Sequence, residues 1–387
     1  MPRVAMVVNS DFRYDSRVQK EALALSQAGH DVTVFSLAMT VPQDQSFPGI
    51  RVLNPTTEKM AWFPYKPSYL KACRQVLCAL LRENGDIWHG HDLDTLPFAY
   101  LAAKLKGGKL VYDSHELWPG YDWPGGSLRL KFARRLLWKG WLRLERILAR
   151  RCHLVIAVNE SCALEMSRSL GIKAPLVLRN CVDPVAEGDA AGVGLRERLG
   201  LVRGETLAVY TGQFQTGRGL ENLITAWAGF DDGAHLALVG KGPLEKKLRR
   251  MVLLAELKNV HFLPPVKAWE LPGFICGATL GVVLIEDVDL CRRFSLPNKL
   301  LEYIAAGIPA LASDLPEIRR LVEKYPVAVF ADPREPHSIR TVLETFLLDG
   351  AGLAERKKNA LEARENLSWQ REVRGLVAAY SKLCDRF

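Results

Sequence analysis

Residues 207–227, LAVYTGQFQTGRGLENLITAW, place a short apolar run before a glycine-rich turn and a helical segment after it. The pattern predicts a strand over Leu207–Tyr210 and a helix over Leu220–Trp227. Strand, glycine turn and helix is the unit from which parallel sheets flanked by helices are built. Backbone N–H groups of such a turn, together with Arg218, suit a phosphate. By itself the turn is equally typical of a plain connection between a strand and a helix.

The same alternation of short strands and helices extends through the chain. Candidate strands before the turn are Val4–Val8, Asp31–Ser36, Ile87–His89, Lys109–Tyr112 and Leu154–Val158. Those after it are Ala234–Val239, Val260–Phe262, Leu280–Leu284, Ala310–Ala312 and Ala328–Phe330. The pattern stops over 184–204, a stretch rich in Gly, Ala and charge, where we expect a linker. The sequence therefore predicts an α/β protein with two Rossmann-like, doubly wound parallel-sheet domains, 1–183 and 205–365, and a terminal segment 366–387.

Composition agrees with a two-domain globular protein. The chain has 387 residues, 48% hydrophobic and 25% charged, and its length suits two domains of ordinary size. Its eight cysteines are scattered without a CxxC pair, which argues against a disulfide framework or a zinc site. The opening MPRVAMVVNS is too poor in apolar residues for a signal peptide. The stretch 271–285 is shorter than the ~20 residues needed to cross a bilayer, so we expect a cytoplasmic protein whose membrane attachment, if any, is peripheral.

Nearly all of the chain's net charge of +9 lies in one segment. Residues 127–151 hold nine Lys or Arg and one Glu. On a helix the apolar residues Leu130, Ala133, Leu137, Trp141, Leu144 and Leu148 lie on one side, and Arg135, Lys139, Arg143, Arg146 and Arg150 lie on the other. The basic side suits an anionic lipid surface, at about 1 kcal/mol per Lys or Arg, and a solvated surface is the alternative. We expect no nucleic acid, because no base-stacking or helix-turn-helix pattern accompanies the charge.

Residues 295–307, SLPNKLLEYIAAG, form a second candidate site. Asn298 is a suitable N-cap for a helix over Lys299–Ala306, and the start of a helix attracts an anion. Lys299 adds a cation in the first turn. Glu302, one turn further along, suits the two hydroxyls of a ribose, and a solvent-exposed helix carboxylate is the alternative.

Two loops of the first domain each follow a strand, HGHDLDTLP (89–97) and YDSHELWPG (112–120). Loops after parallel strands open on the ligand-binding edge of the sheet. His115 and Glu116 are the better candidates for chemistry there, although His115 also suits a structural role.

The HxHD pattern of His89, His91 and Asp92 suggests a metal site. Asp92 is equally suited to an N-cap, and no third ligand is evident. We therefore predict no metal.

Aromatic residues follow the second loop in WPGYDWPGG, 118–126. Trp118, Tyr121 and Trp123 suit stacking on a sugar or along a lipid tail. The alternative is that they cover the core of their own domain.

Taken together, these motifs resemble the retaining glycosyltransferases of family 4, which have the GT-B fold of two facing Rossmann-like domains. The resemblance covers most of the chain and rests on DSRVQKEALALSQAGHDVTVFS (15–36), HGHDLDTLP, LVYDSHEL (110–117), VYTGQFQTGRGLENLITA (209–226) and PNKLLEYIAAGIPALAS (297–313). The ending LSWQREVRGLVAAYSKL (367–383) is similar to the closing helices that cross back to the first domain.

The resemblance implies a role for each matched residue. The catalytic residues would be His115, beside the donor sugar, with Glu116, Arg218 and Lys299. Contacts to the donor would come from Gly212, Gln213, Gly217, Arg218, Gly240, Ser295, Leu296, Asn298, Lys299 and Glu302. Contacts to the acceptor would come from Asp15, Arg17, Asp92, Trp118, Tyr121 and Trp123.

Two positions depart from the family pattern. Phe294 stands where many members have a sugar-touching glutamate, and Gln213 stands where a phosphate-binding arginine is usual. Lys299 is a candidate to compensate for the missing cation.

The resemblance implies sugar transfer from a nucleotide-diphosphate sugar, with retention, without a metal or other cofactor. We expect a saccharide or lipid-linked saccharide as acceptor, in cell-surface polysaccharide or glycolipid synthesis at the cytoplasmic membrane face. Three alternatives stay open: a cytosolic transferase for a storage glucan or small glycoside, a non-catalytic binding or scaffold protein, and a sugar-nucleotide epimerase of the same fold.

Overall fold

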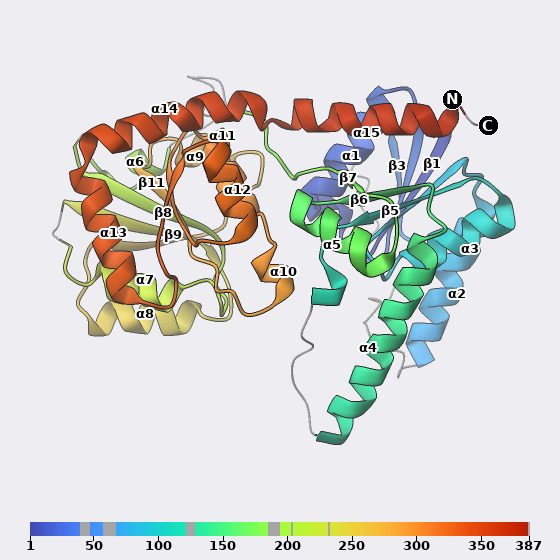
Figure 1. The fold of residues 1–387 in the computed structure, drawn as a ribbon, viewed down its shortest axis with the longest axis horizontal. Helices are drawn as coiled ribbons and strands as arrows, with labels where there is room; N and C mark the ends of the chain where they lie inside the picture. The colour runs from blue at the N-terminus through green and yellow to red at the C-terminus, as the bar shows by residue number, and fades with distance from the viewer. Residues whose placement is uncertain are drawn as a thin grey trace. The chain divides into compact units, whose positions relative to one another are not determined.

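The computed structural model describes residues 1–38, 47–56, 67–120, 128–184, 194–202, 204–230 and 233–385, with only the backbone for 67–69, 119 and 128–134. The chain divides into two compact units (Figure 1). Unit 1 comprises Met1–Arg179 and Val373–Phe387, and unit 2 comprises Asn180–Glu372.

Unit 1 is built on a seven-stranded parallel sheet in the order β3-β2-β1-β4-β5-β6-β7. Its strands are β1 (Arg3–Val8), β2 (Asp31–Ser36), β3 (Ile50–Leu53), β4 (Ile87–His91), β5 (Lys109–Ser114), β6 (Leu154–Ala157) and β7 (Leu176–Val177). The central strands β1 and β4 are almost fully buried, as expected for a sheet covered on both faces. The register of β4 and β5 pairs His91 with Asp113.

The helices of unit 1 connect these strands. They are α1 (Ser16–Gln27), α2 (Pro67–Arg82), α3 (Leu96–Lys106), α4 (Leu128–Ala149) and α5 (Glu160–Leu170), with short 3-10 turns η1 (Phe12–Tyr14) and η2 (Trp118–Gly120). The last helix, α15 (Trp369–Cys384), also joins unit 1 from Val373 onward. Figure 1 shows α4 extending well beyond the sheet.

Unit 2 has a six-stranded parallel sheet in the order β10-β9-β8-β11-β12-β13. The strands are β8 (Thr206–Gln213), β9 (Ala234–Lys241), β10 (Val260–Leu263), β11 (Leu280–Val283), β12 (Ala310–Ala312) and β13 (Ala328–Phe330). The helices are α6 (Leu195–Arg198), α7 (Leu220–Trp227), α8 (Glu245–Leu254), α9 (Leu271–Ile275), α10 (Leu290–Arg293), α11 (Asn298–Ala305), α12 (Pro316–Lys324), α13 (Pro336–Leu348) and α14 (Gly350–Asn366). Two apolar clusters fill the space on the two sides of this sheet.

The predicted α/β class and the two doubly wound parallel sheets are confirmed. All eleven predicted strands are present, and several run further toward their carboxyl ends than predicted. β3 and β7 were not predicted, since they are edge strands of only four and two residues. Within the predicted linker 184–204, the described part includes α6, whose Leu195 is buried in a core cluster of unit 2.

No helix in the described part of the chain is long and apolar enough to span a membrane.

Candidate active site

The glycine-rich turn of unit 2 lies at the carboxyl ends of two paired strands. The register places Gly212 of β8 beside Gly240 of β9, and Gln213 beside Lys241. These residues were predicted in loops, but both strands extend through them. Gln213 is exposed, and its carbonyl accepts a hydrogen bond from the Tyr210 hydroxyl at 2.8 Å. The end of β8 is thereby held while the Gln213 side chain remains accessible.

Gly219 shapes the start of α7. It is the residue before the helix and has φ 62°, a left-handed conformation that glycine adopts with the least strain. A Cβ at this position would lie 2.7 Å from the Leu284 Cβ. The loop is also tied to the segment after β11, because the Glu286 N–H donates to the Gly217 carbonyl at 3.2 Å.

Arg218 stands on this loop, half-buried. The Gln215 amide is oriented so that both of its polar atoms form hydrogen bonds. Its oxygen accepts from Arg218 Nη2 at 3.2 Å, and its nitrogen donates to Gln213 Oε1 at 3.2 Å. Gln213, which replaces the usual arginine, therefore helps to orient the arginine that remains.

Arg292 is a cation near the loop that sequence reasoning missed. It belongs to the short helix α10, whose N-cap Asp289 accepts a hydrogen bond from the Arg292 N–H. A Cβ on Gly217 would lie 2.5 Å from Arg292 Nη1, so the guanidinium lies directly against the glycine. No sequence signal points to it, because α10 is only four residues long and its packing is tertiary.

The segment around α11 brings further predicted residues to the same edge. Ser295 Oγ donates to the Arg292 carbonyl at 2.7 Å, and Leu296 packs against the core. Asn298 was predicted as N-cap, and this was wrong: the residue before the helix is Pro297, without a side-chain cap bond, and Asn298 is the first helical residue. Proline holds φ at −67°, so the helix begins one residue earlier than predicted.

Tyr303 anchors α11 to the sheet. Its hydroxyl accepts from the Thr211 N–H at 3.1 Å and lies 3.2 and 3.3 Å from the carbonyls of Val209 and Val282. The orientation of α11 is therefore set by bonds to β8 and β11.

Lys299 is held close to an aromatic face. Its ammonium lies 3.6 Å from the centre of the Tyr210 ring, a cation–π contact. Burial lowers the pKa of Lys299 well below its usual value, and the charge of Arg218 lowers it further, while Glu302 opposes this. Glu302 is half-exposed on the same helix. An anion at this edge would relieve the repulsion between the two cations.

His115 of unit 1 is held by carboxylates on two sides. Its Nε2 lies 2.9 Å from Asp113 Oδ2, its backbone N–H donates to Asp92 Oδ1 at 2.9 Å, and its Nδ1 lies 3.5 Å from Asp92 Oδ2. Burial disfavours the charged imidazole, but the two carboxylates outweigh it and raise the pKa of His115 to about 10. His115 is therefore a donor at neutral pH.

Asp92 was a candidate N-cap for α3 and a predicted acceptor ligand. Thr95 occupies the cap position instead, and Asp92 has φ 65° in the turn between β4 and α3. Its side chain faces His115, so the structure gives it a positioning contact. The N-cap alternative is wrong because the turn after β4 is three residues longer than a direct cap would need.

Arg17 was predicted to contact the acceptor, but the structure shows its side chain buried and paired within unit 1. Its side chain is 5% exposed and pairs with Asp113 at 2.8 Å and Glu21 at 3.0 Å, and it donates to the Leu178 carbonyl at 2.7 Å. The guanidinium is thus used within unit 1. Asp15 caps α1 by accepting from the Val18 N–H and also accepts from Ser10 Oγ at 2.6 Å.

The remaining first-domain candidates divide by exposure. Glu116 is exposed. Trp118 is buried and packs against Trp138 of α4, with ring centres 6.1 Å apart, which fits covering of the core and is against stacking on an acceptor. Tyr121 and Trp123 lie outside the described residues.

The sequence shows no third ligand for the HxHD pattern. The fold brings the carboxylates of Glu21 and Asp113 to His89 and His91, while Asp92 is not part of this group. Neither carboxylate was singled out in the sequence, because each is distant along the chain and within an ordinary helix or strand pattern.

Two family models match the chain in succession. Residues 16–185 match Glycosyltransferase Family 4, and residues 195–365 match Glycosyl transferases group 1. The chain belongs to the family 4-type glycosyltransferases. The resemblance stated from its motifs is confirmed, and the two parallel-sheet units are those of a GT-B enzyme.

Individual relatives of this glycosyltransferase are distant. A putative colanic acid biosynthesis glycosyl transferase of Escherichia coli is 27% identical over 164 residues, 41% of this chain and 40% of that protein. A D-inositol 3-phosphate glycosyltransferase of Rhodococcus opacus is 23% identical over 94% of this chain and 84% of that protein. The crystal structure of Anabaena Alr3699/HepE in complex with UDP and glucose superposes with TM-score 0.73 at 16% identity, covering 99% of this chain and 100% of that one.

Proposed function

We propose that this glycosyltransferase transfers a sugar from a nucleotide-diphosphate sugar to a saccharide or lipid-linked saccharide, with retention. The observation that carries the proposal is the group of cations at the carboxyl edge of the unit 2 sheet. Arg218 comes from the loop between β8 and α7, Arg292 from α10 and Lys299 from α11.

The arrangement suits a leaving diphosphate. The transition state of sugar transfer places negative charge on the departing phosphate, and fixed cations and N–H groups that meet this charge lower the barrier. Arg218 and Arg292 offer planar donors, and Lys299 a point charge. Glu302 suits the ribose hydroxyls. These groups supply the charge that a divalent ion on the diphosphate would otherwise supply, so we expect transfer without added Mg²⁺ or Mn²⁺.

The nucleotide is best tested first with uridine. Support for this choice comes from the Anabaena structure, which shares the fold and contains UDP and glucose. Calorimetry with a panel of uridine, guanosine and adenosine diphosphate sugars is expected to find one that binds to wild type and binds at least tenfold more weakly to Arg218→Ala. Absence of any binding would favour the scaffold alternative.

For the acceptor, α4 favours a membrane-bound substrate. Arg135, Lys139, Arg143, Arg146 and Arg150 are all exposed, as predicted. Leu136 and Leu137 beside them are 65% and 41% exposed. Exposed apolar residues among basic ones suit the headgroup region of an anionic membrane. The similarity to the colanic acid protein is consistent with a surface polysaccharide.

A small soluble acceptor is the second candidate. It is favoured by the match, over nearly the whole chain, to a D-inositol 3-phosphate glycosyltransferase. Once the donor is known, transfer to membrane extracts and to inositol phosphates would separate the two candidates. Proton NMR of the product would show whether the anomeric configuration is retained, and donor turnover without acceptor would favour the epimerase alternative.

A further inference from the structure

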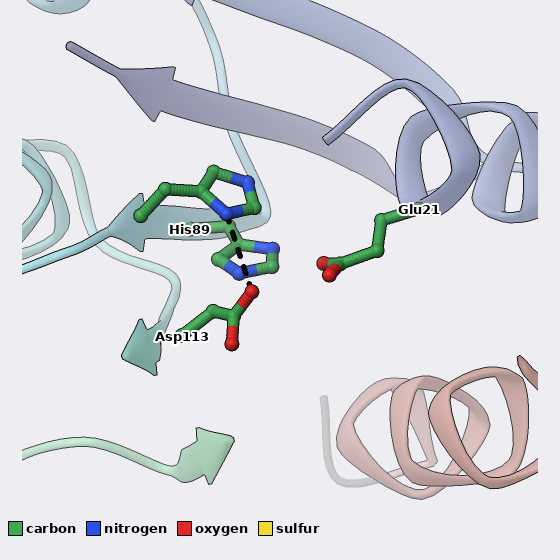
Figure 2. A group of neighbouring side chains, drawn as sticks. Glu21, His89 and Asp113 are labelled. Atoms are coloured by element: carbon green, nitrogen blue, oxygen red, sulfur yellow. Dashed lines mark ion pairs between the residues drawn. The ribbon is translucent and has the colours of Figure 1, made fainter. Parts of the chain in front are cut away.

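Four side chains of types that bind metal ions in proteins converge in the interior of unit 1. They are Glu21 from α1, His89 and His91 from β4, and Asp113 from β5 (Figure 2). One ligand-type atom of each lies within 4.8 Å of the others, and all four residues are buried. Figure 2 shows the Glu21 carboxylate directed toward His89.

The two histidines are arranged by the strand itself. Side chains two residues apart on a strand lie on the same face, and the rings of His89 and His91 are stacked with centres 4.1 Å apart. The HxH spacing thus presents two imidazoles side by side toward α1.

Their outer nitrogens are held by neighbours, and their inner nitrogens are not. His89 Nδ1 lies 2.7 Å from the Tyr380 hydroxyl of α15. His91 Nδ1 lies 3.2 Å from His115 Nε2 and 3.4 Å from Asp113 Oδ2. The Nε2 atoms of both residues have no hydrogen-bond partner. With the protons on Nδ1, each Nε2 carries a lone pair, the arrangement in which histidines bind metals.

Glu21 completes the group. It lies 3.0 Å from Arg17, but neither of its oxygens accepts a hydrogen bond of suitable geometry. The ion pair with Arg17 leaves this buried carboxylate without a hydrogen bond of suitable geometry, and such a carboxylate favours further positive charge. Two imidazole nitrogens without hydrogen-bond partners lie beside it, and the three groups together point to a cation.

We propose that Glu21, His89 Nε2 and His91 Nε2 bind a divalent first-row transition ion. Two imidazoles and a carboxylate are a donor set that suits Zn²⁺ and its neighbours. Asp113 and Tyr380 are positioning residues that fix the imidazoles by their Nδ1 atoms. The ion would join α1 to β4 and, through Tyr380, to α15, so its role is structural and separate from the predicted diphosphate contacts of unit 2.

The test is zinc binding by the full-length, untagged protein after treatment with a chelator and dialysis. Competition with a chromophoric chelator is expected to show that the wild-type protein binds one equivalent of Zn²⁺ tightly. Glu21→Gln, which keeps the size of the side chain, is expected to weaken it by more than the roughly 10- to 100-fold that loss of an orienting residue alone causes. His91→Gln is expected to do the same.

A matched control uses another imidazole pair. His235 and His261 of unit 2 lie 3.1 Å apart, outside the proposed site, so His261→Gln is expected to bind zinc as wild type does. Equal affinity in wild type, Glu21→Gln and His91→Gln, or no tight equivalent in wild type, would overturn the proposal and indicate adventitious binding only.

Spectroscopy covers the case in which the variants fail to fold. Co²⁺ in the wild-type protein is expected to show visible bands of nitrogen and oxygen coordination without near-ultraviolet thiolate absorption. The chain has eight cysteines, so thiolate bands would place the ion elsewhere and contradict the proposal. Nucleotide-sugar binding is measured in parallel, since its loss or retention reports on unit 2 and leaves the metal result interpretable by itself.

Discussion

The Lys299 ammonium lies 3.6 Å above the Tyr210 ring, and this contact joins the start of α11 to the end of β8. It places a cation at the sheet edge where Gln213 stands in place of the usual arginine. An aromatic face favours the charged form of Lys299, whereas burial and the charge of Arg218 lower its pKa. A bound anion would favour the charged form further.

Replacement of Lys299 tests whether it compensates for Gln213. Lys299→Ala is expected to lower kcat/KM for the donor by roughly 10²-fold, since the loss of one charge-stabilising donor costs about this much. Lys246→Ala on the exposed side of α8 is the control and is expected to be neutral. Steady-state kinetics check both, and wild-type kinetics in Lys299→Ala would refute the compensation.

The glycine at the start of α7 allows a comparison of strain with steric overlap. Gly219 and Gly200 have nearly equal φ angles, 62° and 68°. A Cβ added to Gly219 would lie 2.7 Å from the Leu284 Cβ, whereas a Cβ added to Gly200 would have no neighbour within 4 Å. Both alanine variants bear the left-handed backbone penalty of about 1–2 kcal/mol. Gly219→Ala alone is expected to lose further stability and weaken donor binding, measured by denaturant unfolding and calorimetry; equal losses would show that the overlap is absorbed.

Glu145 predicts a pH dependence of stability. It is the one acidic residue in 127–151, is buried, and accepts from the Tyr112 hydroxyl at 2.9 Å. Burial raises its pKa from 4.5 to about 7, although the bond from Tyr112 opposes this. A raised carboxyl pKa means that the folded state favours the proton, so this stabilising contribution is present below pH 4.5 and is lost as pH rises through 7.

Glu145→Gln mimics the protonated form. Relative to wild type, the variant is expected to gain stability between pH 5 and pH 8, by up to about 3 kcal/mol. Any pH-independent effect of the substitution on the free energy of unfolding cancels when the two pH values are compared. Denaturant unfolding at several pH values checks it, and a pH-independent difference would mean that Glu145 ionises in the folded protein as it does in water.

The surface of α4 predicts binding to anionic vesicles. Lys139→Glu/Arg143→Glu reverses two exposed charges one helical turn apart and is expected to abolish flotation with anionic vesicles at physiological salt. Lys246→Glu/Arg250→Glu on α8 has the same spacing and change of charge, so it controls for net charge. Flotation of the α4 variant together with wild type, or no flotation of wild type, would rule out this surface.

Much of the fold follows from local pattern. Leu220–Trp227 was predicted with the bounds observed, and the runs at Ala310–Ala312 and Ala328–Phe330 are strands as predicted. Buried parallel strands are continuous apolar runs that alternate with amphipathic helices, so short-range periodicity is enough to find them.

Residues whose role depends on distant partners were assigned less well. Arg17 looked available on a helix start, but it is paired with Asp113, 96 positions away. Trp118 looked like a stacking residue, but α4 covers it. Arg292 had no motif and still lies against Gly217. A local pattern cannot contain these facts, because each depends on which elements pack together.

Local sequence was enough to predict the two parallel sheets, the glycine turn at Gly217 and the family, since these depend on periodicity, on turn chemistry and on motif order. Which charges meet became known only from the packed fold. It put Lys299 on Tyr210, held His115 between two carboxylates, and brought Glu21 to His89 and His91. The reason is physical: burial and charge pairing depend on distances in space, and strands and helices far apart in the chain set those distances only once they have packed.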